Sequence, residues 1–160
     1  MSDTHSFLAP DLSAVDVANV IAAGVAEAVS LGIQESIVVV DKGGHVLGSL
    51  RMDGSFPGGM YGAEGKARVA ALLAKSTMLT QEQAGAGGFL VPPVPAPAGA
   101  FAPVPTLETL QGVFGVGRLN YSQGGVPILR GGVCVGAVGV GGNTSANDQT
   151  VAVAAAAVIH

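Results

Sequence analysis

The stretch VVVDKGGHVLGSLRMDG, residues 38–54, places carboxylate, imidazole and guanidinium groups in and beside two apolar runs. Asp41 and His45 flank a Gly-Gly turn. A carboxylate next to such a turn commonly accepts backbone N–H bonds, and a histidine there is more often solvated or bonded to the turn than bound to a ligand. The pattern therefore favours structural roles for both residues, with proton transfer as the alternative.

Arg51 and Asp53 fall on one face of a strand, because Met52 between them points to the other face. In one interpretation the two charges form an ion pair that stabilises the strand end by about 0 to 1 kcal/mol if exposed. In the other, the Arg51 guanidinium binds the carboxylate of a ligand. The sequence leaves both interpretations open.

Lys66 lies early in a predicted helix, where a solvated charge is the simplest interpretation. Alternatively, Lys66 supports anion binding or acts as a base, after desolvation beside another cation lowers its pKa, with Glu27 as its acidic counterpart. Gly124 and Gly125 begin a GGVP segment without the Lys-Ser/Thr of a phosphate-binding loop. These glycines would let the backbone approach a flat ligand or permit a bulge at a sheet edge.

Apolar periodicity and turn residues predict the elements that position these groups. An S-x-x-D capping pattern at Ser13 begins a first helix that ends before Gly32, with Leu12, Val15, Val25 and Val29 on its apolar side. The other predicted elements are strands over 37–40 and 45–52, a helix over 62–79, a Pro/Gly-rich loop over 80–105, a short strand or turn over 110–116, a hairpin over 124–142 and a helix over 152–159.

The composition predicts a single domain over residues 1–160 that associates with copies of itself. Hydrophobic residues make up 49% of the chain and charged residues only 11%, which leaves little polar cover for an isolated monomer. The net charge of -4, with scattered basic residues, argues against a nucleic-acid partner. Neither a membrane span nor a secretory signal is expected, and Cys134 is interpreted as a core residue, so a cytoplasmic location is the prediction.

Several kinds of site find no support in the pattern. Three histidines and one cysteine lie far apart, so no zinc spacing is present and no metal ligand is assigned. No serine stands in a G-x-S-x-G turn, which argues against a serine hydrolase of that type.

Four blocks in the same order carry a family resemblance: VVVDKGGHVLGSLRMDG, GKARVA, GGVPILRGGVCVGAVGVGG and SANDQTVAVAA. Together they resemble the GlcG/HbpS-like haem-binding proteins, which also occur as the C-terminal module of some cobalamin adenosyltransferases. The resemblance implies an α/β (α+β), profilin-like fold, a five-stranded antiparallel sheet flanked by helices, assembled into dimers or larger rings such as octamers. The chain departs from the family in its long Pro-rich loop and in Val140, which stands where a small polar residue is usual.

The resemblance implies a soluble oligomeric protein that binds haem or a related tetrapyrrole in a pocket near a subunit interface. The ligand-binding residues expected under this hypothesis are Arg51, Asp53, Lys66, Gly124 and Gly125. Without a C-x-x-C-H motif, any haem is held without thioether links. The alternative is an enzyme that uses the same pocket for acid–base chemistry on an organic acid or carbonyl substrate, with Glu27, Asp41, His45 and Lys66 as candidate catalytic residues.

Overall fold

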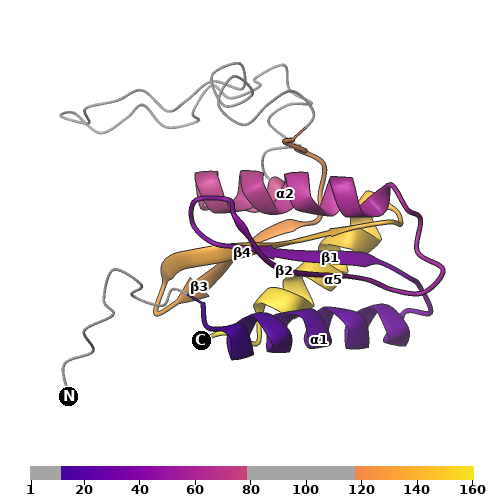
Figure 1. Cartoon of the computed structure of the whole chain (residues 1–160), viewed down its shortest axis with the longest axis horizontal. Coiled ribbons are helices and arrows are strands. Elements are labelled where there is room, and N and C mark those ends of the chain that lie inside the picture. The colour runs from indigo at the N-terminus through magenta and orange to yellow at the C-terminus, as the bar shows by residue number, and fades with distance from the viewer. Residues whose placement is uncertain (1–11, 79–117) are drawn as a thin grey trace.

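The computed structural model describes residues 12–78 and 118–160 (Figure 1). The predicted Pro/Gly-rich loop over 80–105 and the strand or turn over 110–116 lie outside these residues. The elements in chain order are α1 (Ala14–Ser30), β1 (Ser36–Val40), β2 (Val46–Arg51), α2 (Gly59–Leu73), β3 (Gly125–Arg130), β4 (Val133–Gly141) and α5 (Ser145–Ala156).

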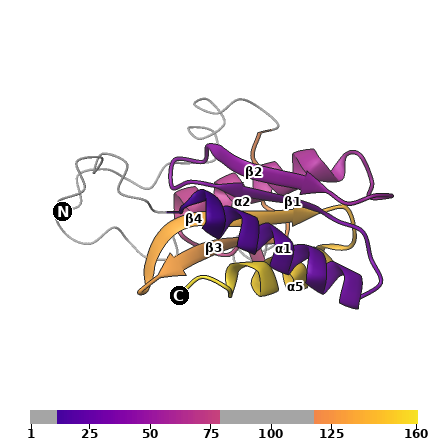
Figure 2. The same ribbon diagram turned by 60° about the horizontal axis from the view of Figure 1, so that its bottom comes forward.

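The four strands form one sheet in the order β2-β1-β4-β3, and every pair is antiparallel. Helix α2 covers one face of the sheet, and α1 and α5 cover the other (Figure 1). Figure 2 shows α1 and α5 next to each other over that second face. The prediction of an antiparallel sheet flanked by helices is confirmed, although the described residues contain four strands rather than the five expected.

Strand β1 lies at the centre of both cores. Ile37 and Val39 pack with α1 and α5, whereas Val38 and Val40 pack against α2, and all four are buried. A strand covered on both faces takes apolar side chains at every position instead of alternating them. This is why the β-branched run was recognisable as a buried strand from sequence.

Helix α1 begins where its capping pattern predicts. The Ser13 hydroxyl accepts a hydrogen bond from the Asp16 N–H at 3.1 Å, and Asp16 Oδ2 accepts one from the Ser13 N–H at 2.8 Å. This capping box satisfies two N–H groups that a helix start leaves without partners.

The predicted apolar side of α1 is right only in part, because Leu12 and Val25 pack against the core whereas Val15 and Val29 do not. Val15 and Val29 are 68% and 64% exposed, and the buried face consists of Val17, Val20, Gly24 and Ala28. A Cβ on Gly24 would lie 2.8 Å from Ile37 Cδ1, so the helix contacts the sheet through its small residues. Gly24 thus leaves room for the Ile37 side chain, beside the buried Val17 and Val20.

Helices α2 and α5 are both present as predicted, but their bounds differ from the predicted ones. Helix α2 begins three residues before the predicted 62 and ends at Leu73, where Ala74 adopts a left-handed conformation with φ 49°. Helix α5 begins at Ser145 rather than 152, because the Thr144 hydroxyl accepts a hydrogen bond from the Asn147 N–H and caps the helix there.

The β3–β4 turn at Gly131 and Gly132 has positive φ at both glycines, as the predicted Arg-Gly-Gly turn requires.

Helix α2 lies directly on β4 because glycine occupies the contact. A Cβ on Gly139 would lie 2.6 Å from the Ala67 nitrogen and closer still to the Ala63 carbonyl oxygen. Both atoms belong to the helix backbone, which a side-chain rotation cannot move away.

Gly139→Ala should therefore lower the free energy of unfolding by about 3 kcal/mol or more, since the helix must separate from the strand. The matched control is Gly62→Ala in the same helix, where the new Cβ would make only an ordinary 3.5 Å contact with Asn120 Nδ2. This control should stabilise the protein by about 0.5 to 1 kcal/mol. Urea unfolding measures both, and equal effects of the two substitutions would contradict the close contact.

Candidate functional site

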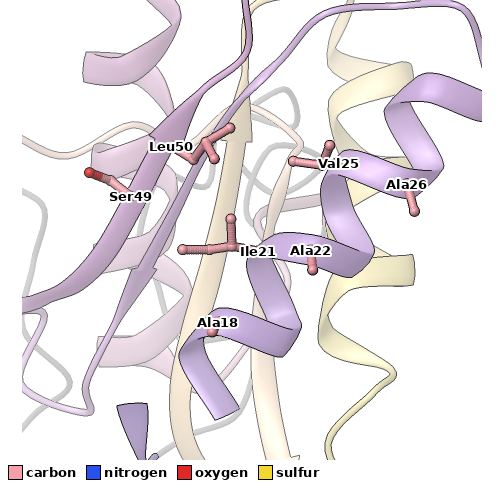
Figure 3. A pocket seen from close by; sticks show the side chains of 7 residues that line it. All are labelled: Ala18, Ile21, Ala22, Val25, Ala26, Ser49 and Leu50. Carbon is pink, nitrogen blue, oxygen red and sulfur yellow. The ribbon is translucent and has the colours of Figure 1, made fainter. Parts of the chain in front are cut away.

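An apolar groove of about 580 Å³ runs between α1 and β2 (Figure 3). Ile21 and Val25 from the helix and Leu50 from the strand extend into the space between the two elements. The remaining lining residues are small: Ala18, Ala22, Ala26 and Ser49. The alanines recur every four residues on one face of the helix, and their small side chains leave space above that face. The groove volume lies in the range of roughly 300–1,000 Å³ that is typical of small-molecule sites.

A polar hollow of about 470 Å³ adjoins the groove, since Val25 and Leu50 line both. Its other walls are Gln34, Arg51, Met52 and Asp53, and it is called the Arg51 hollow below. Within residues 12–78 and 118–160, no ion pair or hydrogen bond engages the Arg51 guanidinium or the Asp53 carboxylate. The Arg51–Asp53 ion pair considered from sequence is therefore not formed there, which leaves the guanidinium free to contact a ligand.

Strand β2 forms an edge of the sheet beside the groove. Among the described strands it pairs only with β1. Val46, Leu47 and Leu50 are 46%, 43% and 39% exposed. An exposed edge with apolar side chains offers both backbone hydrogen-bonding groups and apolar area to a partner.

A second feature is an ion pair between α2 and α5, which lie on opposite faces of the sheet. Lys66 Nζ lies 2.6 Å from Asp148 Oδ2, and both side chains are only 4% exposed. Lys66 Nζ also donates to the Val140 carbonyl at 3.0 Å, and Asp148 Oδ1 accepts from the Asn143 N–H at 3.1 Å. These additional hydrogen bonds help to offset the desolvation of the buried pair.

Glu35 lies beside this pair, immediately before β1, and is fully buried. Neither carboxyl oxygen has a hydrogen-bond partner of ordinary geometry among the described residues. Burial raises the pKa of Glu35 to about 8, the negative charge of Asp148 adds to this shift, and the charge of Lys66 opposes it. Glu35 is thus mostly protonated at neutral pH, and Glu35, Lys66 and Asp148 form a buried cluster with no net charge.

Two glycines close the backbone over the buried cluster. A Cβ on Gly142 would lie 3.1 Å from Glu35 Oε2 and 2.9 Å from Ser55 Oγ. A Cβ on Gly124 would lie 3.1 Å from Lys66 Nζ. Both glycines also have positive φ, +135° and +118°, which other residues rarely adopt.

The structure gathers only part of the predicted ligand-binding set. Arg51 and Asp53 share the Arg51 hollow, but Lys66 is enclosed in the buried cluster. Gly124 packs against Lys66 and Asp148, and Gly125 exchanges hydrogen bonds with the Thr77 hydroxyl, so neither glycine lines the hollow. The predicted pairing of Lys66 with Glu27 is wrong, because Lys66 pairs with Asp148 of α5 instead.

The structure brings together only two of the four candidate catalytic residues. Asp41 and His45 meet at the β1–β2 turn, where His45 Nδ1 lies 3.2 Å from Asp41 Oδ1. Glu27 and Lys66 lie apart from them, on α1 and α2. Asp41 Oδ1 accepts hydrogen bonds from the Gly43 and His45 N–H groups, at 2.8 and 2.9 Å, and so holds the β1–β2 turn. Within the described part of the chain, Lys66 has no ion pair or hydrogen bond to the other three. The described residues also contain no group of three or more His, Cys, Asp or Glu side chains that could hold a metal ion. Cys134 is half-buried and is a free thiol.

Sequence reasoning missed the groove, Glu35 and the pairing role of Asp148. Ala18, Ala22 and Ala26 recur every four residues, which is the one sequence signal for the groove. Glu35 stands two residues before Ile37, so a strand register places it on the buried α1/α5 face. Asp148 lies shortly before the last predicted helix, over 152–159, and nothing local links it to Lys66.

Helices in the described residues are all too short or too polar to cross a bilayer.

Comparison with known proteins identifies relatives over most of the chain. The family model described as "Haem degrading protein HbpS-like" matches residues 12–157. Protein GlcG of Escherichia coli K12 is 38% identical over 121 residues, 76% of this chain and 74% of GlcG. The crystal structure of a Streptomyces reticuli HbpS double mutant has a TM-score of 0.70 at 26% identity, over 100% of this chain and 90% of that one. The PduOC:Heme complex has a TM-score of 0.73 at 22% identity, over 93% and 95%.

The hydrogen bonds of the β1–β2 turn predict different costs for removing its two candidate acid–base groups. Asp41→Ala should lower the free energy of unfolding by about 1 kcal/mol, since two turn N–H groups lose their acceptor. His45→Ala should cost less than about 0.5 kcal/mol, because the 81% exposed imidazole leaves the backbone bonds of the turn intact. Denaturant unfolding of both variants measures this, and an equal or larger cost at His45 would contradict the assignment of the turn to Asp41.

Proposed function

The chain belongs to the haem degrading protein HbpS-like family, and we propose that it binds haem or a related tetrapyrrole in the apolar groove between α1 and β2. The observation that carries this proposal is the apolar groove that ends at the unpaired guanidinium of Arg51. A tetrapyrrole combines a large apolar macrocycle with carboxylates at its edge, and the groove and the hollow offer the matching surfaces in the same order.

The residues present fit such a ligand. Ile21, Val25 and Leu50 supply apolar contacts to the macrocycle, and the flanking alanines leave room for a flat molecule. Arg51 can bind a propionate through two parallel N–H···O bonds, a geometry for which guanidinium is better suited than ammonium. Bound haem would supply an iron centre there, whereas these residues bind the macrocycle and orient its acid groups.

The proposal includes a second copy of the chain beside the groove. Ala22, Ala26 and Leu50 are exposed, so a flat ligand in the groove of one subunit keeps one face toward solvent. The exposed apolar edge of β2 adjoins this open side, and the low charge content of the chain favours covering such a surface. We therefore place the ligand at a boundary between the subunits of a homo-oligomer, and we keep the cytoplasmic location predicted from the sequence as part of the proposal.

The relatives support the choice of haem. The family description names haem, and the PduOC structure, which shares the fold, is a complex with heme. The acid–base alternative receives no comparable support, because the described residues do not bring its four candidate groups together.

Titration with hemin should give a saturable shift of the Soret band. Arg51→Ala should weaken hemin binding at least about tenfold, because a single charge-assisted hydrogen bond to a carboxylate already contributes about 1.5 kcal/mol and the guanidinium can form two. The matched control is Arg118→Ala, which removes the same charge from an exposed residue outside the groove and the Arg51 hollow.

Sedimentation checks that each variant keeps the oligomeric state of the parent protein, since loss of assembly would also lower the affinity. Absorbance that never saturates would contradict haem binding. Equal affinities of the Arg51 and Arg118 variants would remove Arg51 from the site.

A further inference from the structure

The buried cluster contains a group that neither the fold nor the proposed function uses. Glu35 is fully buried, and its two oxygens lack partners among the described residues. It faces Asp148 of α5 and lies against the loop that follows β2, at Ser55, and against Gly142 at the end of β4. Three segments from different parts of the chain therefore meet at one carboxyl group.

We propose that Glu35 is a proton-binding site, and that its proton holds closed the end of the sheet where β1, β4, α2 and α5 meet. The protonated carboxyl is uncharged and can donate a hydrogen bond to Asp148. When the proton leaves, this end of the fold loosens.

The charges around Glu35 explain why the proton is needed. Lys66 from α2 and Asp148 from α5 are the charged groups that face it, and they already neutralise each other at 2.6 Å. Ser55 and Gly142 bring no charge. An ionised Glu35 would give the buried cluster two carboxylates and one ammonium, and a net charge in a dry site is costly.

The cluster is joined to the wall of the Arg51 hollow. The Met52 N–H donates to the Glu35 carbonyl at 2.9 Å, and the Glu35 N–H donates to Met52 Sδ at 3.4 Å. Met52 and Gln34, the neighbour of Glu35 in the chain, both line the hollow. Loss of the proton should therefore also loosen the segment that forms the hollow, whichever ligand the hollow binds.

The direction of the pH dependence follows from linkage. The pKa of Glu35 rises from an ordinary value of 4.5 to about 8 in the folded protein. The folded chain therefore retains a proton that the unfolded chain releases between these values. The stabilisation of the fold by this proton is fully present below pH 4.5, is lost as the pH rises from there to about 8, and does not change further above about 8.

The test compares urea unfolding across pH for the parent protein, Glu35→Gln and the control Glu27→Gln. Glutamine keeps the shape of the protonated carboxyl and a hydrogen-bond donor but cannot ionise. Between the two pKa values, the unfolding equilibrium constant of the parent should rise by up to about tenfold per pH unit relative to Glu35→Gln. Glu27→Gln, on α1, should retain the parent's dependence.

Infrared spectroscopy provides a second readout that needs no variant to fold. The folded parent protein should show the C=O stretch of a buried protonated carboxyl at neutral pH, and this band should vanish as the pH rises through about 8. Parallel stability curves for the parent and Glu35→Gln would overturn the proposal. So would the absence of the protonated band at neutral pH, and neither result depends on haem binding.

Discussion

The ion pair between Lys66 and Asp148 constrains more of this fold than any other single contact in the described residues. It joins α2 on one face of the sheet to α5 on the other, with Val140 of β4 bonded to the same ammonium. Removing two ions from water costs several kcal/mol each, so the pair persists only with near-complete hydrogen bonding. The Asn143 N–H before α5 therefore bonds to Asp148, and the Val140 carbonyl near the end of β4 bonds to Lys66. Gly124 leaves the space beside the ammonium that a larger residue would fill.

Because of such contacts, several of the candidate catalytic residues have structural roles and are not available for chemistry. Lys66 holds the layers together, and Asp41 holds a turn and lies 3.2 Å from the His45 imidazole. Three of the four candidate acid–base residues therefore already have structural partners. What remains exposed is an apolar groove with one unpaired guanidinium at its end. Such a surface is suited to holding an amphiphilic molecule that is flat and acidic at one edge. The proposal of a binding protein rests on this division.

Features set by neighbouring residues could be predicted from sequence, and features set by distant ones could not. The Ser13 capping box, the buried strand from Ile37 to Val40 and the glycine turn at 131–132 each depend on a few adjacent positions. The partner of Lys66 lies 82 residues along the chain, and no local pattern selects Asp148 over Glu27. The buried side of α1 could be predicted only in part: Val25 packs against the core, but the contact with Ile37 is made at Gly24, which carries no apolar side chain to reveal it.

The most direct measurement of the central claim is a double-mutant cycle on Lys66→Met and Asp148→Leu, followed by denaturant unfolding. The account predicts that each single substitution costs about 3–5 kcal/mol, because it leaves an uncompensated buried charge, and that the double variant recovers most of the summed loss. The half-exposed Arg130–Asp16 pair, at 3.1 Å, provides a reference cycle with a coupling below about 1 kcal/mol. Additive costs at Lys66 and Asp148, or a coupling no larger than that of the reference, would contradict the account.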